Sequence, residues 1–295
     1  MTAEDANPVQ KLDAAIERLR PLHTTLGKPR PGDWLAQHRE TGQTFAQYLA
    51  AFPTRPSGKR TVIWIQPLGD FTPEQRKIVR LTAGLMSGFY NMPVKIKEDI
   101  PLSAVPARAR RAHPQWGVKQ ILSTYVLDEI LLPRLPEDAA VYLAFTASDL
   151  WPGEGWNFVF GQASLRERVG VWSIARNGDP AADEAGFRLC LLRTLKTAVH
   201  ETGHMFSMEH CTLYECGMCG SNHREESDRQ PLWFCPECTA KVCWATGTQP
   251  AEHYRRLLAF CAEQGLKAEE EFCRKSLKTL GEPAPAAPPP AKERP

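Results

Sequence analysis

Residues 197–241 contain the feature that most restricts how this chain can fold. It is a histidine pattern that requires a helix to lie beside a metal ion. His200, Glu201 and His204 form the pattern HExxH. Residues four apart lie on one face of an α-helix, so the two imidazoles can reach one tetrahedral zinc ion. Glu201, next to the first ligand, is then placed to take a proton from the water that zinc acidifies. The pattern predicts a catalytic zinc site with Glu201 as general base.

A third histidine lies where it can complete this site. His210 follows His204 by six residues, the spacing of the extended pattern HExxHxxGxxH. That pattern needs the helix to stop and the chain to turn back, and it leaves one metal position open for water. Ser207 stands where the pattern has glycine, and a left-handed turn there costs a non-glycine residue roughly 1–2 kcal/mol. The alternative third ligand is a downstream carboxylate, Glu225 or Glu226, and the pattern favours His210.

Five cysteines within 28 residues indicate a second metal site, of a structural kind; they are Cys211, Cys216, Cys219, Cys235 and Cys238. Cys235 and Cys238 form a CxxC knuckle, which needs a second cysteine pair to complete a four-cysteine zinc site. Local spacing alone favours Cys216 with Cys219 as that pair. Cysteines crowded beside a histidine pattern are typical of metal binding rather than of a disulfide framework.

The stretch HETGHMFSMEHCTLYECGM, followed by FCPEC, resembles the archaemetzincin family. The family pattern runs from HExxHxxGxxH directly into a cysteine, four residues, a cysteine, one residue and a methionine, and later into CxxC. PGDWLAQHRETGQTFAQYL and the segment 145–176 are similar to members of the family too, so the resemblance covers roughly residues 25–245.

This resemblance implies a role for each residue of the two patterns. The implied catalytic zinc ligands are His200, His204 and His210, with Glu201 as the general base. The implied structural zinc ligands are Cys211, Cys216, Cys235 and Cys238, which leaves Cys219 over. Met218 becomes the Met-turn residue beneath the catalytic metal, and the chain is expected to bind two zinc ions.

The order of the expected elements predicts an α/β fold. Strands are expected at 61–66, 94–100 and 139–146, with helices from Thr72 and over 118–132 between them, which is the βαβαβ order of a sheet backed by helices. In the metzincin fold, which the resemblance implies, an edge strand follows above the zinc cleft. The candidates are 156–163 and 170–175, although 156–163 could instead be a core hairpin strand. The active-site helix should begin near Ala182.

Four segments are expected along the chain. Residues 1–58 form a helical and loop extension, 59–206 the α/β catalytic subdomain with the active-site helix, 207–280 a C-terminal subdomain with the Met-turn and the four-cysteine zinc site, and 281–295 a disordered proline-rich tail. Amphipathic patterns predict further helices at 8–20, 42–52, 251–265 and 267–280.

Composition narrows the expected partners. The 36 basic and 34 acidic residues nearly balance, so no nucleic-acid or membrane partner is expected. A small basic cluster, Arg108, Arg110 and Arg111, is expected to be solvated surface in a loop. The polar N-terminus without an apolar segment, and cysteines that indicate metal binding rather than disulfides, predict a soluble cytoplasmic protein. The pattern leaves the oligomeric state open.

The function that these patterns favour is a zinc-dependent metallopeptidase acting on a peptide or protein substrate. Archaemetzincins are described as peptidases with an aminopeptidase-like preference, so the resemblance implies aminopeptidase action. Such an enzyme needs a carboxylate for the substrate α-ammonium, and the sequence points to none. Two alternatives remain: a zinc-stabilised binding module built on the cysteines, and an inactive peptidase homologue, for which Ser207 is the one hint.

Overall fold

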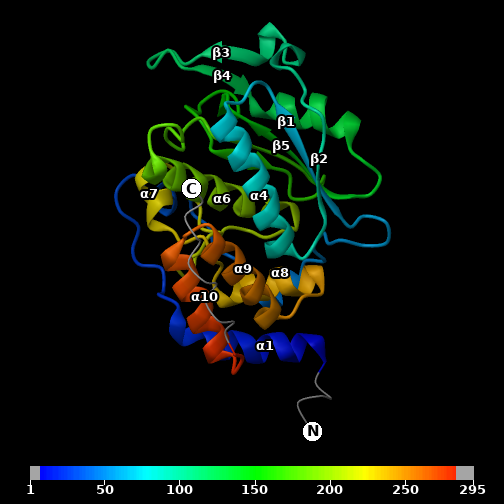
Figure 1. Cartoon of the computed structure of the whole chain (residues 1–295), viewed down its shortest axis with the longest axis vertical. Helices are drawn as coiled ribbons and strands as arrows, with labels where there is room; N and C mark the ends of the chain where they lie inside the picture. Colours follow the sequence, from blue (N-terminus) through cyan, green and yellow to red (C-terminus); the bar gives the residue numbers. More distant parts are fainter. Residues whose placement is uncertain (1–6, 284–295) are drawn as a thin grey trace, which may run out of the picture.

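The main sheet has five strands, with a three-residue strand at each edge, and lies above the C-terminal helices in Figure 1. The computed structural model describes residues 7–283. The strands are β1 (Val62–Leu68), β2 (Val94–Ile96), β5 (Ala139–Thr146), β7 (Gly161–Ala163) and β8 (Val169–Ser173). Their order is β2-β1-β5-β8-β7; β7 is antiparallel to β8, and all other neighbours are parallel. This confirms the predicted α/β fold.

The central strands are apolar because both faces of the sheet are covered. All eight residues of β5 and all five of β8 are buried. Parallel strands need a crossover, and α4 (Pro73–Tyr90) connects β1 to β2. The predicted capping box of Thr72 and Gln75 opens α4, and Asn91 ends it in the left-handed conformation with φ 50°.

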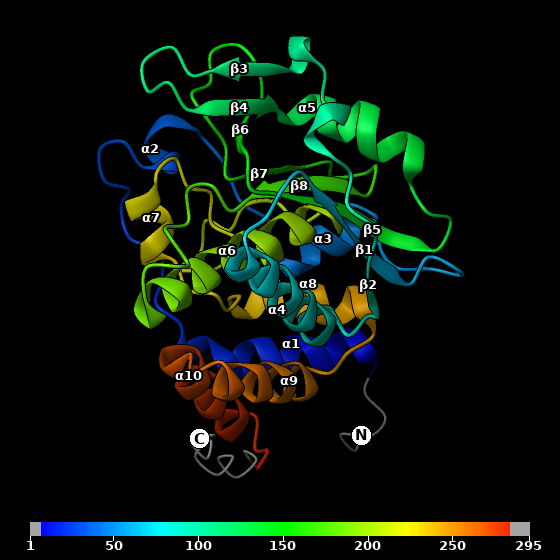
Figure 2. The same ribbon diagram turned by 45° about the horizontal axis from the view of Figure 1, so that its top comes forward.

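The two faces of the sheet have different covers (Figure 2). Helices α4 and α6 (Glu184–Met205) pack together beneath the sheet, and α6 contacts β7 and β8. A π-helical segment, η4 (Val126–Leu131), covers β5 and β8 from the other side. A second sheet lies beside it, in the order β3 (Arg110–Ala112), β4 (Lys119–Leu122) and β6 (Asp149–Trp151).

This second sheet corrects two predictions. The helix expected over 118–132 is wrong at its start, because residues 119–122 form β4; α5 (Ser123–Tyr125), η4 and a 3-10 turn, η5 (Leu132–Arg134), follow. Strand β4 pairs with β3 and β6, and Gln120 donates to Asp149 at 2.7 Å, a long-range contact that helical periodicity does not reveal. The basic cluster is not all loop, because Arg110 and Arg111 belong to β3.

The edge strand is shorter than either candidate segment. Only Gly161–Ala163 forms β7, while Val159 makes an isolated bridge to Leu150. The other candidate, 170–175, is wrong as an edge, because β8 lies between β5 and β7. Strand β2 is also shorter than expected and lies at the opposite edge.

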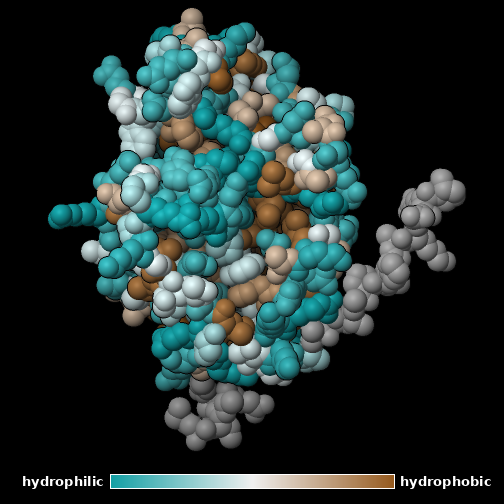
Figure 3. Space-filling view, turned by 90° about the vertical axis from the view of Figure 1, so that its left-hand side faces the viewer, coloured by the Kyte–Doolittle hydropathy of each residue, from teal (hydrophilic) through white to brown (hydrophobic). Residues whose placement is uncertain are grey.

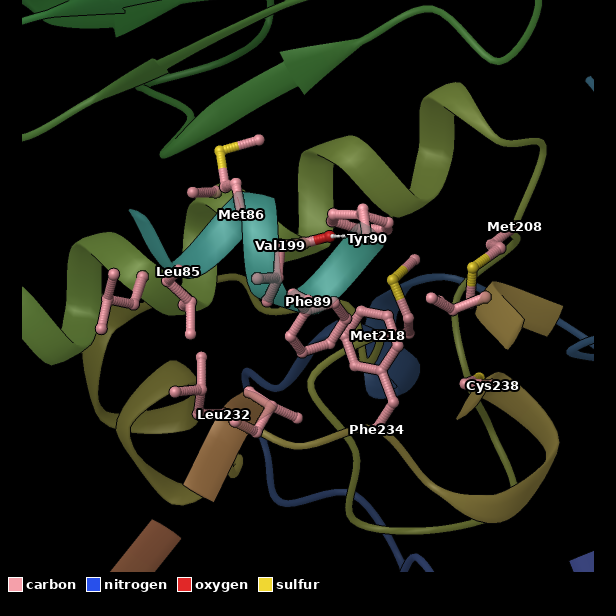
Figure 4. Packing of buried hydrophobic residues seen from close by; sticks show 14 of the residues in the cluster. Leu85, Met86, Phe89, Tyr90, Val199, Met208, Met218, Leu232, Phe234 and Cys238 are labelled. Atoms are coloured by element: carbon pink, nitrogen blue, oxygen red, sulfur yellow. Dashed lines mark hydrogen bonds between the residues drawn. The ribbon is translucent and has the colours of Figure 1, made fainter. Parts of the chain in front are cut away.

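Tyrosine hydroxyls from two other helices fix the end of α6. Tyr90 of α4 donates to the carbonyl of Val199 at 2.5 Å (Figure 4). Tyr48 of α3 (Phe45–Ala50) donates to the carbonyl of Phe206 at 2.8 Å, just past the last turn. Both rings are fully buried, so these bonds hold α6 on each side of His200 and His204.

The C-terminal half is helical. It contains α7 (Arg224–Arg229), α8 (Pro236–Thr246), α9 (Pro250–Glu263) and α10 (Lys267–Thr279), and the last two match the predicted pair. The N-terminal segment contributes α1 (Pro8–Leu19), a 3-10 turn η1 (Arg20–Leu22), α2 (Trp34–Gln37) and α3. Helices α1 and α3 pack against α8, so the extension lies on the C-terminal half (Figure 2).

The four-segment division remains a prediction, and the expected disordered tail lies outside the described residues from 284 onward. Two further 3-10 turns, η2 (Leu102–Ala104) and η3 (Ala107–Ala109), lead into β3. Between residues 7 and 283, not one helix combines the length and the apolar content that a membrane span requires.

A buried histidine makes the fold sensitive to acid. His253 of α9 lies 3.0 Å from the carbonyl of Phe89 through Nδ1, and burial lowers its pKa from 6.5 to about 4. Because the pKa of His253 is lower in the folded protein than in the unfolded chain, the neutral ring contributes fully to stability above pH ~6.5. This stabilisation is lost as the pH falls towards 4. The shift corresponds to roughly 3 kcal/mol.

We therefore expect His253→Asn, which keeps a donor for Phe89 but cannot titrate, to lose less stability between pH 7 and pH 4 than the wild type, by about 3 kcal/mol. Urea unfolding at each pH with equal zinc gives the comparison, since any metal release affects both proteins. Parallel curves for the two proteins would contradict the prediction.

Candidate active site

Three imidazoles converge on one point at the C-terminal end of α6. His200 and His204 lie on consecutive turns of the helix, and His210 comes from the chain that folds back after it. One ring nitrogen of each lies within 4.8 Å of the others. The Nε2 atoms of His200 and His204 are 3.0 Å apart. This is close to the ~3.3 Å edge of a tetrahedron with Zn–N bonds of about 2.0 Å.

The partner of each Nδ1 atom shows which nitrogen can face a metal. Nδ1 of His200 lies 2.9 Å from the carbonyl of Gly217, and Nδ1 of His204 lies 2.7 Å from that of Met208. A carbonyl only accepts, so each Nδ1 carries the proton and each Nε2 presents a lone pair. Two lone pairs 3.0 Å apart repel unless a cation lies beside them, so this pair fits a metal ion.

Electrostatics keeps both helix imidazoles neutral. Burial, with the neighbouring histidines, lowers the pKa of His200 well below its ordinary value. Burial likewise lowers the pKa of His204 to about 4. Neutral imidazole is the form that binds metals, so both rings are in the ligand state at neutral pH.

The third imidazole is oriented by a carboxylate from the N-terminal segment. Nδ1 of His210 lies 3.0 and 3.1 Å from the two oxygens of Glu40, 170 residues earlier in the chain. Although burial opposes it, this hydrogen bond lowers the pKa of Glu40. The rings of Trp34 and His210 pack edge to face with centroids 5.1 Å apart. A carboxylate on Nδ1 fixes the ring and raises the basicity of Nε2.

The turn between the second and third histidines has the strain that its sequence predicts. Ser207 has φ +62°, the left-handed region that glycine favours. Its hydroxyl offsets that cost, because Oγ donates to the carbonyl of Leu165 and accepts from the amide of Thr54, both at 3.0 Å. The serine therefore ties the turn to the loop after β7 and to the N-terminal segment.

Glu201 lies against the edge strand. Its side chain is buried, and a Cβ at Gly161 would lie 2.5 Å from Oε1, so β7 must have glycine at this position. Burial raises the pKa of Glu201 to about 8. A cation held by the adjacent imidazoles would oppose that shift and favour the carboxylate.

A cavity of about 880 Å³ opens onto these residues. Its floor is α6, one wall is the segment 155–163, and the other walls come from 32–38 and 217–231. Aromatic rings close one side: His38 stacks on Trp34 with centroids 4.0 Å apart and on Trp156 with centroids 6.0 Å apart. A cavity of this size suits a peptide segment.

Four cysteines form a separate buried cluster. The Sγ atoms of Cys211, Cys216, Cys235 and Cys238 all lie within 4.8 Å of one another. Those of Cys211 and Cys235 are 3.7 Å apart, close to the ~3.8 Å edge of a tetrahedron with Zn–S bonds of about 2.3 Å. Hydrogen bonds from neighbouring thiols, chiefly that of Cys216, lower the pKa of Cys211. These residues fit a metal site with four thiolate ligands.

The fifth cysteine is outside this group. Cys219 donates to the carbonyl of Tyr214 at 3.2 Å. Cys216 instead accepts from the amides of Met218 and Cys235, at 3.4 and 3.1 Å, and amide donors of this kind stabilise a thiolate ligand. The structure therefore brings together the four cysteines that the resemblance implied, whereas local spacing favoured Cys219.

Met218 lies beneath the histidine helix. A Cβ at Gly203 would lie 2.5 Å from its sulfur, so the helix comes close to Met218 only because this position is glycine. Figure 4 shows the Met218 side chain among buried aromatic rings, including Phe89 and Phe234, whose centroids are 4.8 Å apart. The peptide of Met218 also contacts the cysteine cluster, since its carbonyl accepts from the amide of Cys211 at 2.8 Å.

The carboxylates considered as alternative ligands are engaged elsewhere. Glu226 accepts from the amides of Trp34 and Asn222. Glu225 lies 3.5 Å from Arg30 in an exposed ion pair. Asp33 lies near Glu226 and His223, but it pairs with Arg229 at 2.6 Å. These acidic groups are already partnered within the protein.

Sequence reasoning missed two residues of the site, Glu40 and Gly161. Glu40 lies in the segment 31–49, which only its family resemblance singled out, and no local spacing links it to His210. Gly161 lies in a segment read as an edge strand, where a glycine can mark a close approach of another group.

Removing the Glu40 carboxylate should weaken metal binding without unfolding the protein. We expect Glu40→Ala to raise the zinc dissociation constant of the histidine site about 10–100-fold, because His210 loses its orientation and basicity. Glu40→Gln should recover part of this through its carbonyl oxygen. Chelator competition measures the constants, with Glu209→Ala as a control beside the same histidine, and an unchanged constant for Glu40→Ala would contradict the role.

Figure 3 shows one face of the molecule, on which a patch of hydrophobic side chains lies to the right of the centre. Hydrophilic side chains predominate on the rest of this face, and the other hydrophobic ones form separate patches. Among the large apolar side chains that are exposed, Trp156 lines the cavity and is 42% exposed.

Comparison with known proteins shows which family this chain resembles. The model of Peptidase family M54 matches residues 139–243. Archaemetzincin-2 of Macaca fascicularis is 33% identical over 302 residues, which covers 88% of this chain and 83% of that protein. Archaemetzincin-1 of Homo sapiens is 27% identical, covering 83% of this chain and 55% of that protein.

A solved structure is similar as well. The crystal structure of archaemetzincin from Methanopyrus kandleri matches with a TM-score of 0.50 and 29% identity, over 64% of this chain and 97% of that one. With the identity to archaemetzincin-2 over most of both sequences, these matches show that the chain belongs to the archaemetzincin family of zinc metallopeptidases.

Proposed function

We propose that this protein hydrolyses peptide bonds at a zinc ion held by His200, His204 and His210, with Glu201 as the general base. The observation that carries the proposal is the convergence of three imidazoles whose Nδ1 atoms are all bound to acceptors, beside a buried carboxylate. Bound zinc would polarise the scissile carbonyl and acidify water.

Glu201 is the residue that would move the proton. Its carboxylate would accept a proton from the attacking water and then deliver it to the nitrogen of the leaving amine. Burial and the contact with Gly161 restrict Glu201 to one position, so the base is held in place before substrate binds.

Strand β7 would align the substrate. It pairs with β8 on one side and lies at the edge of the sheet on the other, next to the cavity. An extended peptide can add to such an edge through its backbone amides and carbonyls. A peptide bond of that substrate would then lie over His200 and Glu201, which form part of the floor of the same cavity.

We propose that the four-cysteine cluster holds a second, structural zinc ion, so that each chain binds two. Cys211 directly follows His210, and Cys216 and Met218 flank Gly217, whose carbonyl holds His200. A metal in the cysteine cluster would therefore fix the peptide that supports two of the three histidines.

The carboxylates that line the cavity decide whether a substrate α-ammonium group can bind there. An aminopeptidase preference is what the family resemblance implies, and it needs a carboxylate for the α-ammonium group. Among the described residues that line the cavity, Glu201 is the only carboxylate, and its role is already assigned. We therefore favour cleavage within a bound peptide and keep aminopeptidase action as the alternative.

Replacement of the base tests the proposal. We expect Glu201→Gln to bind both zinc ions but to lose about 10²–10⁴-fold in kcat/KM on a mixed peptide pool, because the amide cannot accept the proton. Elemental analysis and mass spectrometry of the cleaved peptides give the two readouts. Glu225→Gln, at an exposed carboxylate outside the cavity lining, is the matched control.

Three outcomes would contradict the proposal. Equal turnover by Glu201→Gln and the wild type would remove Glu201 from the chemistry. A wild type that holds both zinc ions and cleaves no peptide would favour the inactive homologue, whereas a chain with zinc at the cysteines alone would favour the binding module.

A further inference from the structure

Lys196 lies one helical turn before His200, on the face of α6 that forms the cavity floor. Lys196, Thr197, His200, Glu201 and His204 all line the same cavity. With a rise of 1.5 Å per residue, Lys196 is displaced about 6 Å along the helix from His200. That distance suits a group on the residue next to a peptide bond bound at the histidines.

The ammonium group of Lys196 lacks a carboxylate partner within the described residues. It donates to the backbone carbonyls of Ser227 and Asp228, at 3.5 and 3.4 Å, which are long for charge-assisted hydrogen bonds. No described carboxylate lies within ion-pair distance of Nζ. Since an ammonium group has three donors, it can accept a further anionic partner.

The neighbouring charges leave an excess of positive charge at this end of the cavity. Both oxygens of Asp228 are taken by Arg193, at 2.9 and 2.5 Å. The carboxylates of Asp228 and Glu269 raise the pKa of Lys196, and the guanidinium groups of Arg193 and Arg224 lower it. Two carboxylates therefore stand against three cations, Lys196 included. Burial is the largest influence on Lys196 and lowers its pKa, a cost that an anionic ligand would offset.

The third cation, Arg224, is also incompletely partnered. Its guanidinium lies 4.0 Å from the ring centroid of Phe160, which lines the cavity, and donates to Asn177 at 2.8 Å. Its Nε and Nη1 atoms are buried and have no hydrogen-bond partner. Arg224 therefore adds positive potential behind the cavity wall next to Lys196.

We propose that Lys196 binds a carboxylate of the substrate and so selects peptides with an acidic group beside the cleaved bond. This inference rests on the proposed peptidase function and names its substrate class. The carboxylate has two possible sources, an Asp or Glu side chain or the C-terminal α-carboxylate of a short peptide. The same cation would disfavour a substrate α-ammonium at this end of the cavity.

Matched peptide pairs test the selection. A peptide library containing Glu or the isosteric Gln at each position, with either a free or an amidated C-terminus, is digested and its cleavage sites are mapped by mass spectrometry. A charge-assisted hydrogen bond of about 1.5–3 kcal/mol gives an expected preference of roughly 10–100-fold in kcat/KM for the carboxylate member of a pair. The Glu/Gln arm and the acid/amide arm separate the two sources.

Variants at Lys196 assign the preference. Lys196→Met, which keeps the length of the side chain, should bring the carboxylate-to-amide ratio close to one, and Lys196→Glu should invert it towards basic peptides. Lys275→Met, at an exposed lysine on α10, should leave the ratio unchanged. Zinc content and circular dichroism of each variant establish that it is folded.

The outcomes separate this inference from the peptidase function. Wild-type cleavage with no carboxylate preference, or a preference that persists in Lys196→Met, would overturn the Lys196 inference alone. Calorimetric binding of the same pairs to Glu201→Gln gives a readout without turnover, and equal affinities there would also overturn it. A wild type that cleaves nothing would count against the peptidase function itself.

Discussion

The site depends on the hydrogen bonds that hold the three imidazoles through Nδ1. The acceptors come from Gly217, Met208 and Glu40, which belong to three separate segments of the chain. With those protons fixed, each Nε2 can only present a lone pair, and two of them lie 3.0 Å apart. The fold therefore prepares a position for a cation before one binds, and the rest of the structure serves to hold these acceptors.

Each acceptor is held by a different structural device. The peptide of Gly217 lies between Cys216 and Met218, and Met218 packs beneath Gly203 of the histidine helix. The turn that brings Met208 to His204 includes Ser207 in the left-handed conformation, with its hydroxyl bonded to two other segments. Glu40 depends on the N-terminal segment, which packs on the C-terminal helices. Substitutions far from α6 can therefore change the positions of the three imidazoles.

Local patterns predicted much of the fold and of the site. The histidine and cysteine spacings selected residues that the structure brings together, and β5, α4 and the C-terminal helix pair appeared close to their predicted limits. These features are encoded by periodicity, caps and short spacings, which need no knowledge of distant contacts. The choice of Cys211 over Cys219 came from the family resemblance, because local spacing favoured Cys219, which lies outside the cluster.

The remainder depended on contacts between distant residues. Residues 119–122 have a helical pattern, yet pairing with β3 and β6 makes them a strand. Glu40 could not be predicted for the same reason, because its partner His210 lies 170 residues away in the sequence. The position of Lys196 in the cavity likewise could not be predicted, because it depends on α6 forming the cavity floor.

Zinc stoichiometry of the purified chain, for the wild type and His204→Ala side by side, tests the central claim most directly. The account predicts two zinc ions in the wild type and one in the variant, because the variant loses one imidazole of the histidine site and keeps all four cysteines. A single zinc ion in both proteins would contradict it, since the converging histidines would then not be a metal site.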